Sequence, residues 1–165
     1  MRPVWTALLA LCTAAAAANT SVYTSLEARD CRNLVSDPQG WVEDLCAGVG
    51  GFQLLVQEGD PRQNIVVVRG AARTSLDLWT VLGSSFSTVG PRAEWRLRGG
   101  VPVALIVRYN LSDPAEASRI TSLLAVARLG GRPCVVARIP PGPQQNVLAR
   151  RAADGAAGRG CLRSR

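Results

Sequence analysis

The sequence predicts an α+β fold that is mostly β-sheet, with one C-terminal α-helix and two disulfides. A dense β-branched run at residues 65–68 is typical of a buried strand. The Gly99-Gly100 dipeptide separates two strand-like segments and favours a two-residue hairpin loop. Behind an export leader, an even number of cysteines indicates disulfides. The remaining chain of about 145 residues has the usual size of one domain.

The first 18 residues have the order of a cleavable signal peptide. Arg2 supplies the positive start, an apolar core spans residues 4–11, and small residues follow at 14–18. This stretch is shorter than the ~20 apolar residues of a membrane-spanning helix. A lipid anchor on Cys12 is disfavoured, because Leu11 stands where such a signal requires a small residue. We therefore expect a periplasmic or secreted protein without stable membrane insertion after cleavage.

Four cysteines remain after the leader, because one of the five, Cys12, is removed with it. Four cysteines allow three pairings. Proximity in the sequence favours Cys31–Cys46 and Cys134–Cys161 over the alternatives. Zinc is disfavoured, because no two of these cysteines have the close spacing of zinc ligands and the chain has no histidine. We expect neither a metal nor another cofactor.

The N-terminal half reads as short strands separated by turns. A turn signal at residues 37–40 precedes a strand at 41–45, and a glycine bend at 48–51 precedes a strand at 52–57. This glycine bend is not a phosphate-binding loop, because no lysine follows it and it precedes a strand instead of a helix.

The middle of the chain predicts a hairpin. Residues 94–98 alternate between polar and apolar, and residues 101–109 return as an apolar strand. In this register Trp95 faces Ala104 and Arg96 faces Val103. The return strand is apolar on both faces, so we expect it at the centre of the sheet. The arginine stems would pack beside it while their charged heads reach solvent.

The segment 113–129 has two interpretations. Asp113, Pro114 and Glu116 resemble a helix start, and an apolar helical face follows. The alternative is a turn followed by a strand at 121–129. Local propensity favours the helix.

The C-terminal part predicts a strand at 134–139 and a helix at 144–153 that ends at Gly155. Val147, Leu148 and Ala152 are the expected apolar face of this helix. We expect one domain at residues 19–155 and a basic tail at 156–165, tied back by its cysteine. This tail is either solvated or a binding patch for an anionic polymer.

The absence of histidine and lysine excludes most catalytic chemistry. Without them the chain cannot form a Ser-His-Asp triad, a Cys-His pair, a Ser-Lys dyad or a Schiff base. A pair of carboxylates remains possible in principle, but the spacing singles out no pair. The candidates are Glu43, Asp44, Glu58, Asp60 and Glu94. We therefore predict that the protein is not an enzyme.

Binding requires only a stable surface with aromatic and arginine anchors. The candidate binding residues are Trp41, Trp79, Trp95, Arg96 and Arg98. The alternative is that the aromatic residues fill the core. The net charge of +7, or +6 without Arg2, suits a protein or an anionic envelope polymer as partner, whereas nucleic acid is disfavoured for an exported chain.

The chain resembles a family of exported four-cysteine bacterial proteins of unknown function. The similar features are a tyrosine-led opening before Cys31, Cys46 followed by a glycine bend and Phe52, the 94–97 strand, Arg108-Tyr109, Cys134, the 146–150 segment, and Ala153-Asp154 before Cys161. The resemblance implies a strand at 121–129 and the four-cysteine framework. It implies no activity, and this chain lacks the lysines that similar chains often carry.

Together these observations predict a mostly antiparallel sheet, partly closed or sandwich-like, with the C-terminal helix packed on it. The expected function is that of an exported non-catalytic domain that binds a protein or an envelope component. The alternative function is a carboxylate-dependent hydrolase of the envelope. An exposed aromatic or arginine patch would favour binding, and a cleft with two acids would favour hydrolysis.

Overall fold

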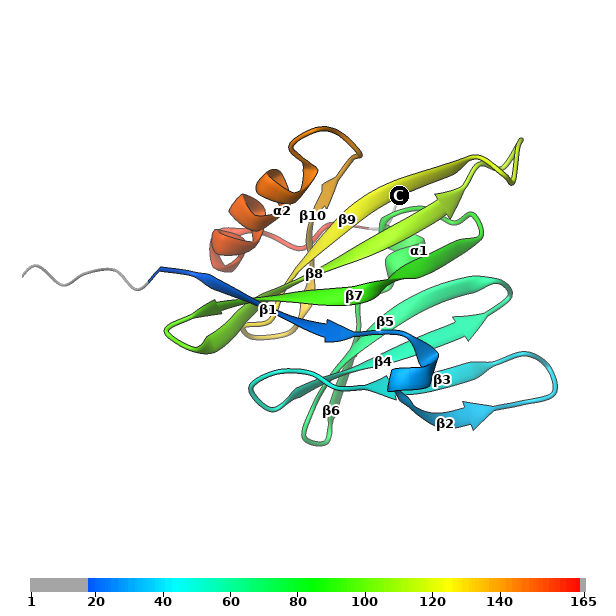
Figure 1. Cartoon of the computed structure of the whole chain (residues 1–165), viewed down its shortest axis with the longest axis horizontal. Helices are drawn as coiled ribbons and strands as arrows, with labels where there is room; N and C mark the ends of the chain where they lie inside the picture. Colours follow the sequence, from blue (N-terminus) through cyan, green and yellow to red (C-terminus); the bar gives the residue numbers. More distant parts are fainter. Residues whose placement is uncertain (1–17, 164–165) are drawn as a thin grey trace, which may run out of the picture.

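The structure of the chain is a computed structural model that describes residues 18–163 (Figure 1). The predicted signal peptide therefore lies outside the described residues, apart from Ala18. The strands are β1 (Thr20–Ser25), β2 (Arg32–Ser36), β3 (Val42–Cys46), β4 (Phe52–Gly59), β5 (Arg62–Arg69), β6 (Ala72–Ser75), β7 (Ser87–Arg98), β8 (Val101–Ser112), β9 (Ile120–Arg128) and β10 (Cys134–Ile139). The helices are α1 (Leu78–Val81) and α2 (Gln145–Asp154), with short 3-10 turns at Ala28–Asp30 and Ala156–Gly158.

The ten strands form one mixed sheet that is mostly antiparallel and does not close. The strand order is β10-β9-β8-β7-β5-β4-β3-β2, with β1 paired to β7 and β6 paired to β5. Strands β5 and β7 meet in parallel, with Arg62 opposite Ser87. We call this junction the seam. The predicted α+β class, with its antiparallel sheet and C-terminal helix, is confirmed.

The seam divides the sheet into two halves whose inner faces share one core. The first half contains β2 to β6, and the second contains β1 and β7 to β10 (Figure 1). Leu54 and Ile65 from the first half join Trp95 and Tyr109 from the second in this core. The ring centroids of Phe52 and Trp95 are 6.2 Å apart across it. The arrangement is therefore sandwich-like.

Helix α2 covers the outer face of β8, β9 and β10. Its Ala149, Ala152 and Ala153 are buried in a second apolar cluster with sheet residues such as Ile106 and Val126. Small side chains on this face let the helix approach the sheet closely. The expected apolar face was wrong in part, because Val147 and Leu148 are 45% and 44% exposed.

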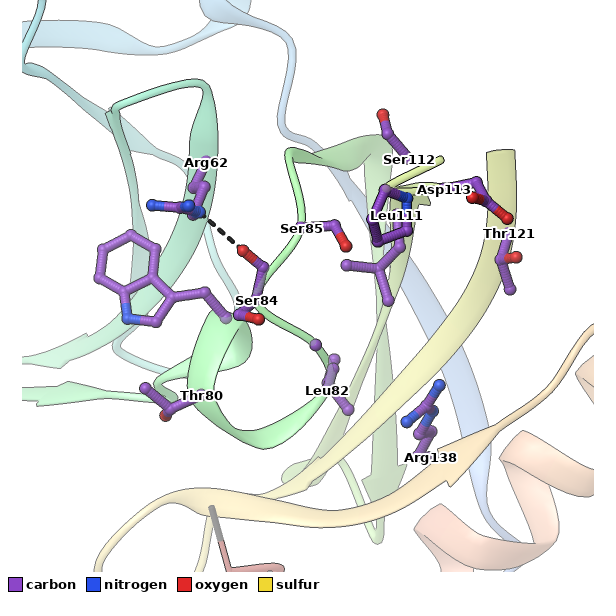
Figure 2. A pocket seen from close by; sticks show the side chains of 13 residues that line it. Arg62, Thr80, Leu82, Ser84, Ser85, Leu111, Ser112, Asp113, Thr121 and Arg138 are labelled. Carbon is purple, nitrogen blue, oxygen red and sulfur yellow. Dashed lines mark hydrogen bonds between the residues drawn. The ribbon is translucent and has the colours of Figure 1, made fainter. Parts of the chain in front are cut away.

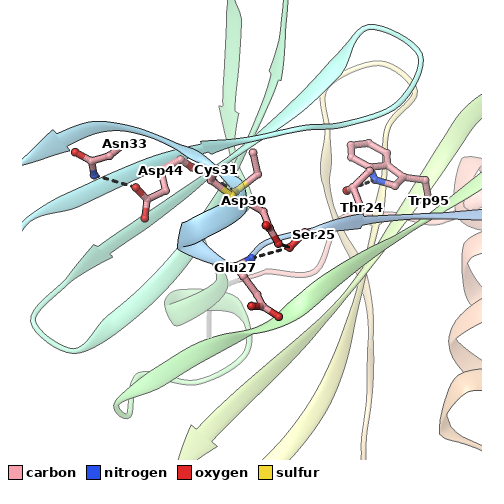
Figure 3. The surroundings of a disulfide bond; sticks show 9 residues. Thr24, Ser25, Glu27, Asp30, Cys31, Asn33, Asp44 and Trp95 are labelled. Carbon is pink, nitrogen blue, oxygen red and sulfur yellow. Dashed lines mark hydrogen bonds between the residues drawn. A yellow bond between two sulfur atoms is a disulfide. The ribbon is translucent and has the colours of Figure 1, made fainter.

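Both predicted disulfides are confirmed. Cys31–Cys46 lies in the first half (Figure 3) and Cys134–Cys161 in the second, so each half has its own cross-link. Beyond α2 the chain returns along β10, where the Leu162 amide donates to the Val135 carbonyl at 2.8 Å.

The segment 113–129 forms a turn and then strand β9, so the helix interpretation was wrong. The Asp113 side chain caps the turn by accepting hydrogen bonds from the amides of Ala115 and Glu116 at 2.8 and 3.3 Å. Strand β9 then pairs with β8 along its whole length, and residues 123–127 are buried. Backbone pairing and burial on both faces outweigh the local helix propensity.

The Gly99-Gly100 hairpin is present, but its register differs from the expected one. Both glycines have positive φ, +56° and +80°, as the loop requires. Trp95 faces Leu105 and Arg96 faces Ala104, with a register shift beyond Arg96. A bulge at residue 103 therefore moves the pairing by one position, which turn chemistry alone does not reveal.

Candidate functional site

Two of the five candidate binding residues, Trp41 and Trp79, line the same hollow beside the seam. This hollow has a volume of about 350 Å³ and adjoins two others of about 710 and 270 Å³. All three share Arg62 in their walls, and Phe86 lines the smallest. We call these three hollows together the Arg62 groove. The fold thus brings together aromatic residues that lie far apart in the sequence.

A tight hairpin turn positions Trp41 at the start of β3. The Asp37 carboxylate accepts from the Trp41 amide at 2.9 Å, while the Asp37 amide donates to the Trp41 carbonyl at 2.9 Å. A Cβ atom on Gly59 would lie 2.6 Å from the indole of Trp41. Only glycine therefore allows the indole to lie this close to β4.

A buried asparagine positions Trp79 on α1. Asn64 is 1% exposed, and its side-chain oxygen accepts from the Leu78 amide at 3.0 Å. Its amide nitrogen donates to the Ser75 hydroxyl at 2.9 Å. Leu78 is fully buried, so the neighbouring Trp79 lies at the groove, half-buried.

Arg62 forms the centre of the groove wall. Its Nη1 donates to the Asp60 carboxylate at 2.6 Å. Its Nε donates to the Ser84 carbonyl at 2.8 Å (Figure 2). Its guanidinium carbon lies 6.0 Å from the centroid of Phe86, whose side chain is 51% exposed. These contacts hold a planar cation beside the Phe86 ring while 34% of the Arg62 side chain remains exposed.

The rest of the groove is rich in hydroxyl groups. Figure 2 shows Ser84, Ser85, Ser112 and Thr121 around the largest hollow. The groove therefore offers aromatic faces, hydroxyl donors and acceptors, and a planar cation. That combination suits a ligand with both apolar faces and many hydroxyl groups.

Tyr109 lies beneath the seam and is fully buried. Its hydroxyl lies 2.6 Å from the Ser87 hydroxyl. Burial raises the pKa of Tyr109, although the Ser87 hydrogen bond and the Arg62 charge act in the opposite direction. The phenol therefore stays neutral and ties β7 to β8 under the groove.

The other three candidate binding residues lie away from the groove. Trp95 is fully buried, and its indole nitrogen donates to the Thr24 hydroxyl at 2.9 Å (Figure 3). It therefore has no surface with which to contact a partner. Arg98 is exposed, and its Nη2 donates to the Asp154 carbonyl at 2.8 Å.

Arg96 does not extend its charged head into solvent as expected. It is 8% exposed, and its Nε and Nη2 donate to the Asp154 carboxylate at 2.8 and 3.0 Å. Its Nη1 donates to the Ser21 hydroxyl at 2.6 Å. Arg96 thus joins β1 and the end of α2 to β7.

A second ion pair lies in the same interface. The Arg150 Nε donates to the Glu94 carboxylate at 2.6 Å, and the Ser21 hydroxyl donates to the same oxygen at 2.6 Å. Burial would raise the pKa of Glu94, but the hydrogen bonds from Arg150 and Ser21 and the Arg150 charge hold it below its usual value. The pKa of Asp154 is also lowered, because the bonds from Arg96 and Asn19 outweigh its burial.

These shifts predict that acid loosens α2 and β1. The ordinary pKa values of Glu94 and Asp154 are 4.5 and 3.8, and folding lowers both. Their stabilisation is therefore fully present above those values and is lost as pH falls through the lower folded values. Thermal unfolding between pH 7 and pH 2 should show a weaker pH dependence for Glu94→Gln than for the wild type.

The matched control for that experiment is Glu116→Gln, which removes an exposed pair with Arg119. Exposed ion pairs contribute little to stability, so its pH profile should follow that of the wild type. If Glu94→Gln and the wild type gave parallel profiles, the ion-pair network would not be the source of the acid sensitivity.

Three of the five carboxylates considered for hydrolysis, Glu43, Asp44 and Glu58, lie on the paired strands β3 and β4. Asp60 lies at the Arg62 groove, whereas Glu94 lines a different hollow on β7. Glu43 accepts from Gln57, Asp44 from Asn33 and Glu58 from Gln63.

Sequence reasoning did not single out Arg62 and Phe86. Arg62 follows a turn like several other arginines, so its local sequence gives no signal. Phe86 lies within a serine-rich loop. An aromatic residue among serines indicates an exposed ring, and this was the one signal that the sequence offered.

Within residues 18–163, no three potential metal ligands of the His, Cys, Asp or Glu type gather at one place. No helix of this described segment combines the length and the apolar character that crossing a bilayer requires. Comparison with protein-family profiles, with curated proteins and with solved structures finds no match for this chain.

Proposed function

We propose that this chain is an exported, non-catalytic binding domain whose Arg62 groove holds a glycan of the cell envelope. The observation that carries the proposal is that Trp41, Trp79 and Phe86 line three hollows that share Arg62, the largest of which is lined by several hydroxyl groups. The leader-like N-terminus and the two disulfides support export.

The groove favours a glycan over a peptide on chemical grounds. A sugar ring presents C–H groups on its faces and hydroxyl groups at its edge. Half-buried indoles such as Trp41 and Trp79 can pack against the faces, while serine and threonine hydroxyls exchange hydrogen bonds with the edge. The guanidinium of Arg62 and the carboxylate of Asp113 add fixed donors and acceptors.

The contacts of the two acids at the groove, Asp60 and Asp113, favour a binding role over hydrolysis. The Asp60 carboxylate is 76% exposed and paired with Arg62. The Asp113 carboxylate caps its own turn and lies 3.9 Å from Arg119. Both carboxylates are thus engaged by contacts that serve the fold, Asp60 with Arg62 and Asp113 with the amides of its own turn.

Tryptophan fluorescence provides the test. Beyond the leader the chain has only Trp41, Trp79 and Trp95, and Trp95 is fully buried. We expect soluble oligosaccharides from envelope glycan to change the emission saturably. Trp79→Ala and Phe86→Ala should each weaken this binding by roughly fivefold or more, as loss of a binding hot spot does.

Val147→Ala is the matched control, because it removes an exposed apolar side chain outside the groove. Its affinity should equal that of the wild type. Saturable binding of peptides but not of oligosaccharides would overturn the glycan assignment. Turnover of the glycan that Asp60→Asn or Asp113→Asn abolishes would overturn the non-catalytic assignment and favour the hydrolase.

A further inference from the structure

A second hollow, distinct from the Arg62 groove, lies where α2 crosses the outer face of the sheet. Its volume is about 440 Å³, within the range of small-molecule sites. Its apolar lining comes from the exposed Pro91 on β7 and from Ile106 on β8 and Leu124 on β9, which are both buried at its floor. Asn146 and Arg150 line it from α2, and being four residues apart they share one helix face.

Three arginines from three elements line this hollow: Arg92 on β7, Arg108 on β8 and Arg150 on α2. We call it the arginine pocket. One carboxylate, Glu94, also lines it, so three positive charges against one negative charge leave an excess of two. Among the described residues, neither Arg92 nor Arg108 has a carboxylate partner within salt-bridge distance.

Arg108 is held in place by neutral groups. Its Nη1 donates to the Ser122 hydroxyl at 2.8 Å and to the Gln145 side-chain oxygen at 3.3 Å. Gln145 is 8% exposed and is fixed in turn by donating to the Ser122 and Ile139 carbonyls at 2.8 and 3.2 Å. A Cβ atom on Gly90 would lie 2.7 Å from the Arg108 Cβ, so the neighbouring strand presses on its stem. The cation is oriented without being neutralised.

Tyr23 lies between the other two arginines. The Arg150 Nη2 donates to its hydroxyl at 2.8 Å, and the guanidinium of Arg92 lies 5.7 Å from its ring centroid. Because Arg150 also pairs with Glu94, the positive excess falls on Arg92 and Arg108. The Ser21 hydroxyl also donates to Glu94, so one of the carboxylate oxygens is already engaged.

We propose that the arginine pocket binds the oxyanion group of an acidic sugar, a carboxylate or a phosphate carried on a single ring. Guanidinium groups recognise both oxyanions through paired, charge-assisted hydrogen bonds. The Tyr23 side chain, which is 48% exposed, offers a contact surface to the sugar, and the volume suits one ring with its substituent. This site is separate from the Arg62 groove and does not depend on the function proposed there.

Calorimetric titration at low ionic strength tests the proposal with four probes. These are glucuronate, glucose 6-phosphate, inorganic phosphate and neutral glucose. We expect saturable binding of glucuronate or glucose 6-phosphate that added salt weakens, weaker binding of inorganic phosphate, and no binding of glucose. Whichever sugar binds more tightly identifies the oxyanion. Equal binding of inorganic phosphate and the acidic sugars would overturn the role of the sugar ring.

Three variants locate the site. Arg92→Gln and Arg108→Gln should each lower the affinity by roughly tenfold or more, as expected for loss of a charge-assisted hydrogen bond. Arg73→Gln removes the same charge from exposed strand β6 in the other half and should bind as the wild type does. Near-ultraviolet circular dichroism checks that each variant is folded.

Glu94→Gln should change the affinity in the opposite direction. Because it removes the one acid from the pocket, it should increase the affinity for anions. No saturable binding of either acidic sugar would overturn the proposal. Equal losses in Arg73→Gln and Arg92→Gln would also overturn it, since they would indicate attraction to overall charge instead of a site.

Discussion

Replacing Trp95 by alanine is expected to lower the melting temperature by roughly 10 °C or more. The side chain is fully buried between the two halves of the sheet, and its ring lies 6.2 Å from that of Phe52. Truncation of a buried large aromatic residue typically costs about 3–5 kcal/mol of unfolding free energy. The variant also leaves the Thr24 hydroxyl without its donor from the indole. Thermal unfolding followed by circular dichroism measures the change.

The comparison with Trp79→Ala makes the result specific. Trp79 lies half-buried at the Arg62 groove, so its truncation removes less buried surface and should lower the melting temperature by only a few degrees. Trp95→Phe, which keeps a ring in the core, should fall between the two. Equal losses in Trp95→Ala and Trp79→Ala would contradict the placement of Trp95 in the shared core.

Removing the Cys134–Cys161 disulfide by a double serine substitution is the second change with a large expected effect. The bond closes a segment with a sequence separation of 27 that contains the whole of α2. Loop closure of this length contributes about 3.5 kcal/mol, against about 3 kcal/mol for the shorter Cys31–Cys46 loop. Chemical denaturation should therefore show a lower midpoint for the Cys134/Cys161 variant than for the wild type.

The strands that lose amide protection in each variant show whether removing a disulfide destabilises one half or the whole fold. The Cys134/Cys161 variant should lose amide protection first in α2 and β10, whereas the Cys31/Cys46 variant should lose it first in β2 and β3. Hydrogen exchange measured by mass spectrometry reads both patterns. Loss of protection in the same strands for both variants would show that the disulfides do not act within separate halves.

The sequence predicted those strands and turns whose signal lies within a few consecutive residues. The β-branched run in β5, the glycine loop between β7 and β8, and the strand at β10 carry their signals within a few residues. Strands β1 and β2 and the short β6 were not predicted, because their residues are mostly exposed and carry little hydrophobic periodicity. Their conformation comes from pairing with β7, β3 and β5.

The candidate sites depend on which residues the fold brings together, and a local sequence pattern does not show this. Sequence reasoning singled out Trp41 and Trp79 as large aromatics but could not show that both lie beside Arg62. It expected the Arg96 head in solvent, because it could not show that Asp154 on α2 lies opposite. Residue type predicted which groups are able to bind, whereas topology decided which of them are free to do so.

The topology has one further consequence. Strands β1 and β7 are antiparallel partners, and their innermost pair is Ser25 and Arg92, so residues 26–91 occupy the place of an ordinary hairpin loop. The entropy of closing a flexible loop grows only with the logarithm of its length, so this insertion costs about 2 kcal/mol more than a short turn. The inserted strands pair mainly with their sequence neighbours and leave Leu26 beside Pro91, where its amide donates to the Pro91 carbonyl at 2.8 Å. The two ends of the insert are therefore adjacent in space. The first half of the protein thus connects β1 to β7 within the second half.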